Sequence, residues 1–254
     1  MQTPPKTKGE LWPAWKREFD RKKRRRLLTL RALGVFIILS FAGALGVRHW
    51  KLRGHAIEFL ETFEAKISNN STELQINRPP RKTEQDWKLF GDAVTRLPSL
   101  CVFQVTDGQF ETIDFLKEHG QLKELGLKNC SKTSDFTALS LLKDLSVLNL
   151  QGTKISDCDA SNIQWPEQLK EASFFRCENL TSKGVEKILA TCREITKLEL
   201  SAENITPEVV SHLNSLPIQE LTIDGILSEE LLSILEHRSR VRFVGVSDPS
   251  GRLH

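Results

Sequence analysis

The residues that could do chemistry in this chain are dispersed. The five cysteines are Cys101, Cys130, Cys158, Cys177 and Cys192, and they form no C-x-x-C pair. The six histidines show no H-x-x-x-H spacing, and the chain has no P-loop, no G-x-S-x-G and no glycine-rich dinucleotide turn. We therefore expect no catalytic residue, no metal site and no cofactor. A catalytic role would have to rest on Asp157 or Cys158, which lie in an irregular segment.

The chain instead repeats one spacing of apolar residues. Leu145 to Asp157 reads L-x-x-L-x-L-x-x-T-x-I, a spacing typical of one leucine-rich repeat, in which a short strand is followed by a turn and a return segment. Seven copies begin at Leu97, Leu122, Leu145, Leu169, Ile195, Ile218 and Val241, at intervals of 25, 23, 24, 26, 23 and 23 residues. The fourth and sixth positions of every copy are apolar. Because one unit cannot bury its own apolar side, the copies must stack, which predicts an α/β solenoid with a parallel, concave sheet.

The return segments favour helices in most copies. Helical spacing of apolar residues predicts helices over residues 110–119 and 182–192. Thr206 before Pro207, and Ser228 before two glutamates, are helix-start signals. We expect a looser arc only over residues 157–166.

Residues 177–192 resemble the cysteine-containing subtype of leucine-rich repeats. Cys177 follows the strand, and Asn-Leu-Thr-x-x-Gly then leads into the return helix, with Cys130 at the equivalent position two repeats earlier. The resemblance covers about residues 97–248 and implies a fold rather than a function. We interpret the cysteines as small buried residues at the turns, since two repeats of separation exceeds the reach of a disulfide.

The N-terminal part predicts a membrane anchor. Residues 1–26 contain ten Lys or Arg against three acidic residues, a net charge of +7, so the rest of the +3 chain carries −4. Residues 27–47 contain one charge, Arg31, and are long enough to cross a bilayer. The basic tail should stay in the cytoplasm, which places the repeats on the other side. Small residues along the anchor would allow a homodimer.

Cleavage is the alternative to a retained anchor. Ala42-Gly43-Ala44 resembles a signal-peptidase site, and cleavage near Ala44 would give a secreted protein. We favour the uncleaved anchor because the apolar run continues beyond Ala44. The expected organisation is a tail (1–26), a transmembrane helix (27–47), a juxtamembrane helix and linker (48–82), a capping helix (83–96) and the repeats (97–254).

The concave face is the expected binding site. Outward-pointing positions near the strand ends supply seven candidate partner-binding residues: Phe103, Lys128, Gln151, Phe175, Arg176, Glu199 and Asp224. Exposed aromatic and arginine side chains are typical anchors of protein interfaces, although either Phe could instead pack into the fold. The acidic repeat region argues against nucleic acid.

The predicted function is a non-catalytic, membrane-anchored scaffold that binds a protein or an extended peptide. Two alternatives stay open at this point. One is an intracellular adaptor of the cysteine-containing repeat type. The other is an accessory or assembly subunit of a membrane complex.

Overall fold

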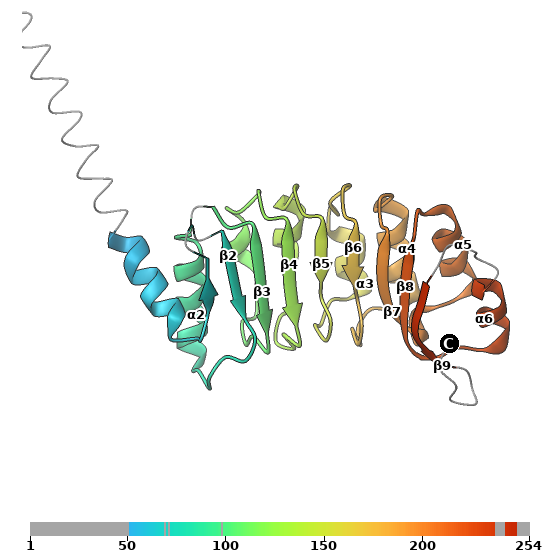
Figure 1. Cartoon of the computed structure of the whole chain (residues 1–254), viewed down its shortest axis with the longest axis horizontal. Coiled ribbons are helices and arrows are strands. Elements are labelled where there is room, and N and C mark those ends of the chain that lie inside the picture. The colour runs from blue at the N-terminus through green and yellow to red at the C-terminus, as the bar shows by residue number, and fades with distance from the viewer. Residues whose placement is uncertain (1–50, 69, 71, 98, 237–241, 248–254) are drawn as a thin grey trace, which may run out of the picture. The chain divides into compact units, whose positions relative to one another are not determined.

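The computed structural model describes residues 51–247, apart from 69, 71, 98 and 237–241. Its central element is one nine-stranded sheet (Figure 1). The strands are β1 (Lys66–Ile67), β2 (Glu73–Ile76), β3 (Val102–Thr106), β4 (Glu124–Lys128), β5 (Val147–Asn149), β6 (Glu171–Ser173), β7 (Lys197–Ser201), β8 (Glu220–Ile226) and β9 (Arg242–Ser247). They lie in chain order; β1 is antiparallel to β2, and all later neighbours are parallel.

The return segments lie behind the sheet in the view of Figure 1. They contain α2 (Glu84–Val94), α3 (Asp157–Asn162), α4 (Ser182–Thr191), α5 (Pro207–Ser215) and α6 (Glu229–Glu236). Three return segments contain 3-10 turns: η1 (Asp114–Leu116), η2 (Thr137–Leu141) and η3 (Ala202–Asn204). Residues 51–61 are also helical. The prediction of an α/β solenoid with a parallel sheet is thus confirmed, and the arrangement is consistent with leucine-rich repeats.

The strands stack in register: each position of the repeat pattern pairs with the same position in the neighbouring strand. The fourth position forms a continuous buried row across the sheet: Leu74, Phe103, Leu125, Leu148, Ala172, Leu198 and Leu221. Alternate side chains of a strand point to opposite faces, so this row and its sixth-position partners form one core between the sheet and the return segments.

The register predicted for the first copy is wrong. Phe103 and Val105 pair with Leu125 and Leu127 and are buried, whereas Val102 is only half-buried. The copy therefore begins at Leu100 rather than at Leu97. Leu97 is also buried, just after α2, so two leucines three residues apart both fitted the first position of the pattern.

The array contains one parallel strand more than the seven predicted. Strand β2 lies within the expected linker and pairs in parallel with β3. As a result α2, which falls in the expected capping segment 83–96, is the return helix between β2 and β3 rather than a cap. The outer side of β2 is instead occupied by β1, and the helix over residues 51–61 contributes the buried residues Ala56 and Leu60.

The return segments also differ from expectation. Residues 110–119 contain only the short turn η1, whereas the expected loose arc contains helix α3. Helix α3 begins with a capping box, in which Ser156 accepts from the Asp159 amide and the Asp159 carboxylate accepts from Ser156. The expected starts at Thr206 and Ser228 are present, since each hydroxyl accepts a backbone N–H of its helix.

The predicted tail and transmembrane segment (1–26 and 27–47) lie outside the described residues. Within the range that is described, no helix is both long and apolar enough to cross a membrane.

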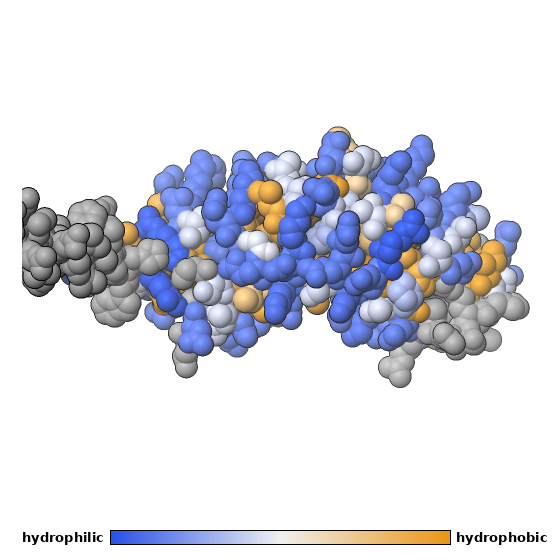
Figure 2. Space-filling model, turned by 90° about the horizontal axis from the view of Figure 1, so that it is seen from above, coloured by the Kyte–Doolittle hydropathy of each residue, from blue (hydrophilic) through white to orange (hydrophobic). Residues whose placement is uncertain are grey.

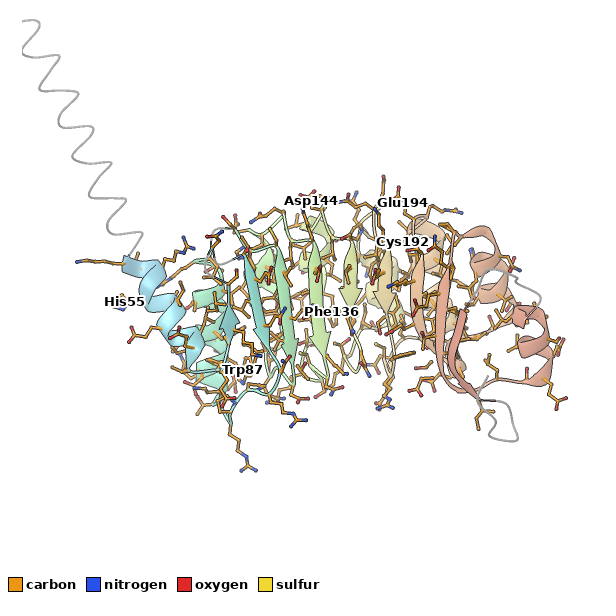
Figure 3. All side chains as sticks on the ribbon, viewed as in Figure 1. His55, Trp87, Phe136, Asp144, Cys192 and Glu194 are labelled. Carbon is orange, nitrogen blue, oxygen red and sulfur yellow. The ribbon has the colours of Figure 1, made fainter. Side chains whose placement is uncertain are left out.

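A cluster of aromatic rings closes the N-terminal end of the array. Phe63 is fully buried, and its ring centroid lies 4.9 Å from that of Trp87 and 5.1 Å from that of Phe90. The Phe90 ring in turn lies 6.2 Å from Phe103 in the first core row. Figure 3 shows Trp87 at this end of the array. The rings thus extend the hydrophobic core at the N-terminal end of the array.

Replacing Phe63 with alanine tests this arrangement. We expect Phe63→Ala to lower the free energy of unfolding by about 3–5 kcal/mol, because a large side chain leaves a cavity that Trp87 and Phe90 line. Hydrogen exchange followed by mass spectrometry should show the largest loss of protection in β1 and β2. The control is Phe59→Ala in the preceding helix, where the ring is only partly buried. Equal losses in the two variants would contradict a capping role for Phe63.

Candidate functional site

The open face of the sheet, opposite the return segments, carries two rows of outward-pointing side chains. The third-position row is Glu73, Val102, Glu124, Val147, Glu171, Lys197 and Glu220. The fifth-position row is Gln75, Gln104, Gly126, Asn149, Ser173, Glu199 and Thr222. Because parallel neighbours lie about 4.8 Å apart, adjacent members of a row can contact one ligand together.

A shallow hollow lies on this face over β5 to β8. It has a volume of about 180 Å³, and its polar walls come from Asn149, Glu171, Ser173, Lys197, Glu199, Glu220 and Thr222. These residues belong to four strands whose equivalent positions are 23 to 26 residues apart along the chain, so only the stacking of repeats brings them together.

Ser173 is the polar group of this hollow that the fold leaves unsatisfied. Its side chain is 5% exposed, and its hydroxyl has no hydrogen-bond partner among the described residues. The flanking members of its row, Asn149 and Glu199, explain the burial, since both have longer side chains on the neighbouring strands. A buried hydroxyl without a partner costs about 1–3 kcal/mol, which a ligand could recover by donating or accepting a hydrogen bond.

Carboxylates dominate the charge of the open face. Lys197 lies between Glu171 and Glu220 in its row and forms an ion pair with Glu171 (3.6 Å). Both partners are about half exposed, so the pair contributes little to stability. Glu199 and Glu220 add two further carboxylates to the same hollow. The hollow thus suits a polar or cationic ligand.

Phe103 is the one predicted site residue that the structure removes from this face. Its side chain is fully buried in the core, because the first copy begins three residues later than expected. The side chains of Lys128, Arg176 and Asp224 are exposed, and those of Gln151, Phe175 and Glu199 are half-buried. Of these six, only Glu199 lines the hollow.

Arg176 and Asp224 are brought together although they are 48 residues apart in the chain. The Arg176 Nε donates to the Asp224 Oδ2 at 3.2 Å, and the Arg176 backbone N–H donates to the Ser201 hydroxyl at 3.0 Å. Arg176 has a positive φ of +53°. The residues at the same position of the three earlier repeats also have positive φ: +60° at Asp107, +55° at Asn129 and +67° at Gly152. These residues form a left-handed turn after each of β3, β4, β5 and β6, a position that favours Gly and Asn.

Ser173, Lys197, Glu171 and Glu220 are the functional candidates that the sequence reasoning missed. Of the seven predicted residues, only Glu199 stands at the fifth position of its copy, and none stands at the third. Strand alternation already places the third position on the open face, so the row of charges there could have been found. The burial of Ser173 depends on its neighbours and leaves no signal in the sequence.

Three of the five cysteines are buried, as expected, whereas Cys158 is exposed and Cys101 is half-buried. Cys130, Cys177 and Cys192 are at most 1% exposed, and all five cysteines are free. The Cys177 thiol donates to the Leu150 carbonyl of the preceding repeat (3.1 Å), and the Cys130 thiol reaches the Val105 carbonyl (3.6 Å). They therefore link adjacent repeats. Within the described range, no group of His, Cys, Asp or Glu has the arrangement of a metal site.

Asp157 and Asp159 have structural partners. Asp157 accepts hydrogen bonds from the Thr181 backbone N–H (2.8 Å) and hydroxyl (2.6 Å), and so fixes the start of α4 in the next repeat. Asp159 belongs to the capping box of α3. These contacts account for both carboxylates without a catalytic role.

Thiol labelling at about pH 8 should separate the cysteines into two groups. Burial raises the pKa of the Cys130 and Cys192 thiols to about 12, and it also raises the pKa of Cys177. These thiols stay protonated near neutral pH and should react slowly with Ellman's reagent, whereas the exposed Cys158 and the half-buried Cys101 react quickly. All five should react in guanidinium chloride. Fast labelling of Cys177 in the folded protein would contradict its placement.

Comparisons with known proteins add the following. No protein-family model matches the sequence, and no curated protein matches it significantly. Among solved structures, the fold is similar to internalin C2 from Listeria monocytogenes, with a TM-score of 0.45 and 20% identity over 62% of this chain. The match spans 66% of the internalin chain. Similarity at this level carries no functional argument, and the repeat fold rests on the register of β2 to β9.

Proposed function

We propose that this chain is a non-catalytic scaffold of the cysteine-containing leucine-rich-repeat type, which binds a protein or an extended peptide on its open face and is held at a membrane by residues 27–47. The observation that carries the binding role is the hollow over β5 to β8, with the unpartnered hydroxyl of Ser173 at its floor. The thiols of Cys130 and Cys177 at equivalent turns support the repeat subtype.

The ligand would cross the strands along the fifth-position row. Asn149 offers an amide that both donates and accepts, and Ser173 and Thr222 offer hydroxyls. Carboxylates at Glu199 and Glu220 would bind a Lys or Arg side chain of the ligand. Affinity would come from complementarity to this fixed arrangement, and no bond is made or broken.

Three of the remaining candidates lie close to this surface. Phe175, half-buried, and the exposed Arg176–Asp224 pair lie at the strand ends next to the hollow, where they would contact a longer ligand. Figure 2, which looks onto one edge of the array, shows mostly hydrophilic residues with hydrophobic ones in separate small groups. That view gives no reason to place the site on this edge.

A peptide-binding experiment tests the open face. Linear peptides of about 12 residues, displayed on phage, would be selected against the purified full chain. We expect the selected peptides to bind the Glu199→Lys/Glu220→Lys variant about tenfold more weakly, because both changes replace an attractive charge with a repulsive one. The charge-matched control is Glu178→Lys/Glu194→Lys, which alters two exposed glutamates outside the hollow. Selected peptides that bind both variants equally would refute the proposed site.

The membrane anchor is tested separately by protease accessibility in intact cells. The chain would carry a tag at His254, and the mature N-terminus would be measured by mass spectrometry. We expect the tag to be cleaved from outside while residues 1–26 are retained, as the basic tail requires. A new N-terminus near Leu45 would show a secreted protein instead. A protected tag would overturn the orientation and favour an intracellular adaptor.

A further inference from the structure

A second concave surface lies on the other side of the molecule, along helix α2. It is a groove of about 500 Å³, within the size range of ligand sites. One wall is a single stripe of α2 at helical spacing: Glu84, Trp87, Lys88, Gly91, Asp92 and Thr95. The other wall is formed by residues 109–112, Asp114 and Phe115. The stripe follows the whole of α2, which is about 16 Å long.

The groove lies where the next return segment contains no α-helix. From α3 onward, consecutive return helices pack against each other, as α3 with α4 and α4 with α5. The return segment after β3 contains only the three-residue turn η1 where a neighbouring helix would lie. One stripe of the 11-residue α2 is therefore left without a helical neighbour among the described residues. The groove between this stripe and residues 109–115 lies where a neighbouring return helix would pack on α2.

The floor of the groove is aromatic. Phe115 lies against α2 at Gly91, where an added Cβ would be 3.0 Å from the Phe115 ring. The Phe115 ring lies 5.5 Å from that of Phe110, which lies 5.6 Å from Trp87. Phe115 is only partly buried, so apolar surface reaches the groove. Aromatic floors of this kind hold the apolar anchors of a docking helix.

The rim of the groove is acidic. Glu84, Asp92, Glu111 and Asp114 line it, against one lysine, Lys88. Lys88 pairs with Glu84 (2.9 Å), and Asp114 pairs with Lys117 outside the lining (2.9 Å). In the part of the chain that the structure describes, Asp92 and Glu111 are exposed and belong to no ion pair. The uncompensated charge of the rim is thus negative.

We propose that this groove docks an amphipathic helix of a partner protein, with its apolar side chains on the aromatic floor and with Lys or Arg along the acidic rim. The docked helix would take the place that a return helix occupies in the later repeats. Helix-in-groove recognition of this kind is read through apolar residues spaced three and four apart. The inference is independent of the open face and of the anchor.

Synthetic peptides test the proposal directly. The first probe is a helical peptide of about 14 residues with Leu at three-four spacing and Lys at the other positions. One matched peptide has Glu in place of Lys, and another has Ser in place of Leu. Binding to the purified full chain in a zwitterionic detergent is measured by fluorescence anisotropy, with micelles alone as the background. We expect the Leu/Lys peptide to bind at least about tenfold more tightly than either matched peptide.

Two variants of the chain locate the binding. Asp92→Lys/Glu111→Lys should weaken the Leu/Lys peptide about tenfold, whereas the charge-matched Glu178→Lys/Glu194→Lys should leave it within about twofold. Hydrogen exchange should show that the peptide protects residues 84–95 and 109–115. Equal weakening in both variants would show attraction to net charge only and would overturn the proposal. Tighter binding of a peptide with the sequence of residues 10–26 would also overturn it, since the occupant would then be this chain itself.

Discussion

The constraint on which the structure depends is that no repeat of about 23 residues can bury its own apolar side. Each strand therefore needs a neighbour in register, and the row from Leu74 to Leu221 is the result. The same constraint makes the ends of the array vulnerable, because the outermost strand has a neighbour on one side only. At the N-terminal end the need is met by rings rather than by another repeat: Phe63, Trp87 and Phe90 continue the core sideways.

Polar groups inside the array serve the same stacking. The Cys177 thiol and the Asn204 amide each donate to a backbone carbonyl of the preceding repeat, and the Asp157 carboxylate accepts from Thr181 in the next one. Such bonds satisfy backbone groups that the turns would otherwise leave buried and unpaired. Because the core and these links use the inward side chains, the proposed ligand of the open face would contact outward positions. Ser173 is outward in register, yet buried and unpartnered, which sets it apart from the rest of the open face.

The repeats from Leu122 to Ile223 could be predicted from sequence because the repeat pattern fits their apolar residues in one register only. At the N-terminal end the pattern was ambiguous, since Leu97 and Leu100 both fit the first position, and the choice of Leu97 placed the buried Phe103 on the wrong face. Strand β2 has four residues with two apolar ones between turn-forming segments, which is too little for the pattern to detect. Of the candidate site, the outward positions followed from alternation. The hollow and the groove did not, because the hollow depends on how side chains of four neighbouring strands pack, and the groove depends on which return segment lacks an α-helix.

The proposed docking of a helix depends on a return segment without an α-helix, because the return helices from α3 onward already contact each other. Helices α3 to α6 pack on one another. Helix α2 instead has the 3-10 turn η1 in the next repeat, and the groove lies along this side of α2. The open face and the groove lie on opposite sides of the sheet and share an excess of carboxylates, in line with the −4 charge of residues 27–254. Two cationic segments could therefore occupy them without competing. If both belong to one partner, each binding event raises the effective concentration of the other, and modest affinities at two shallow sites suffice for a stable complex.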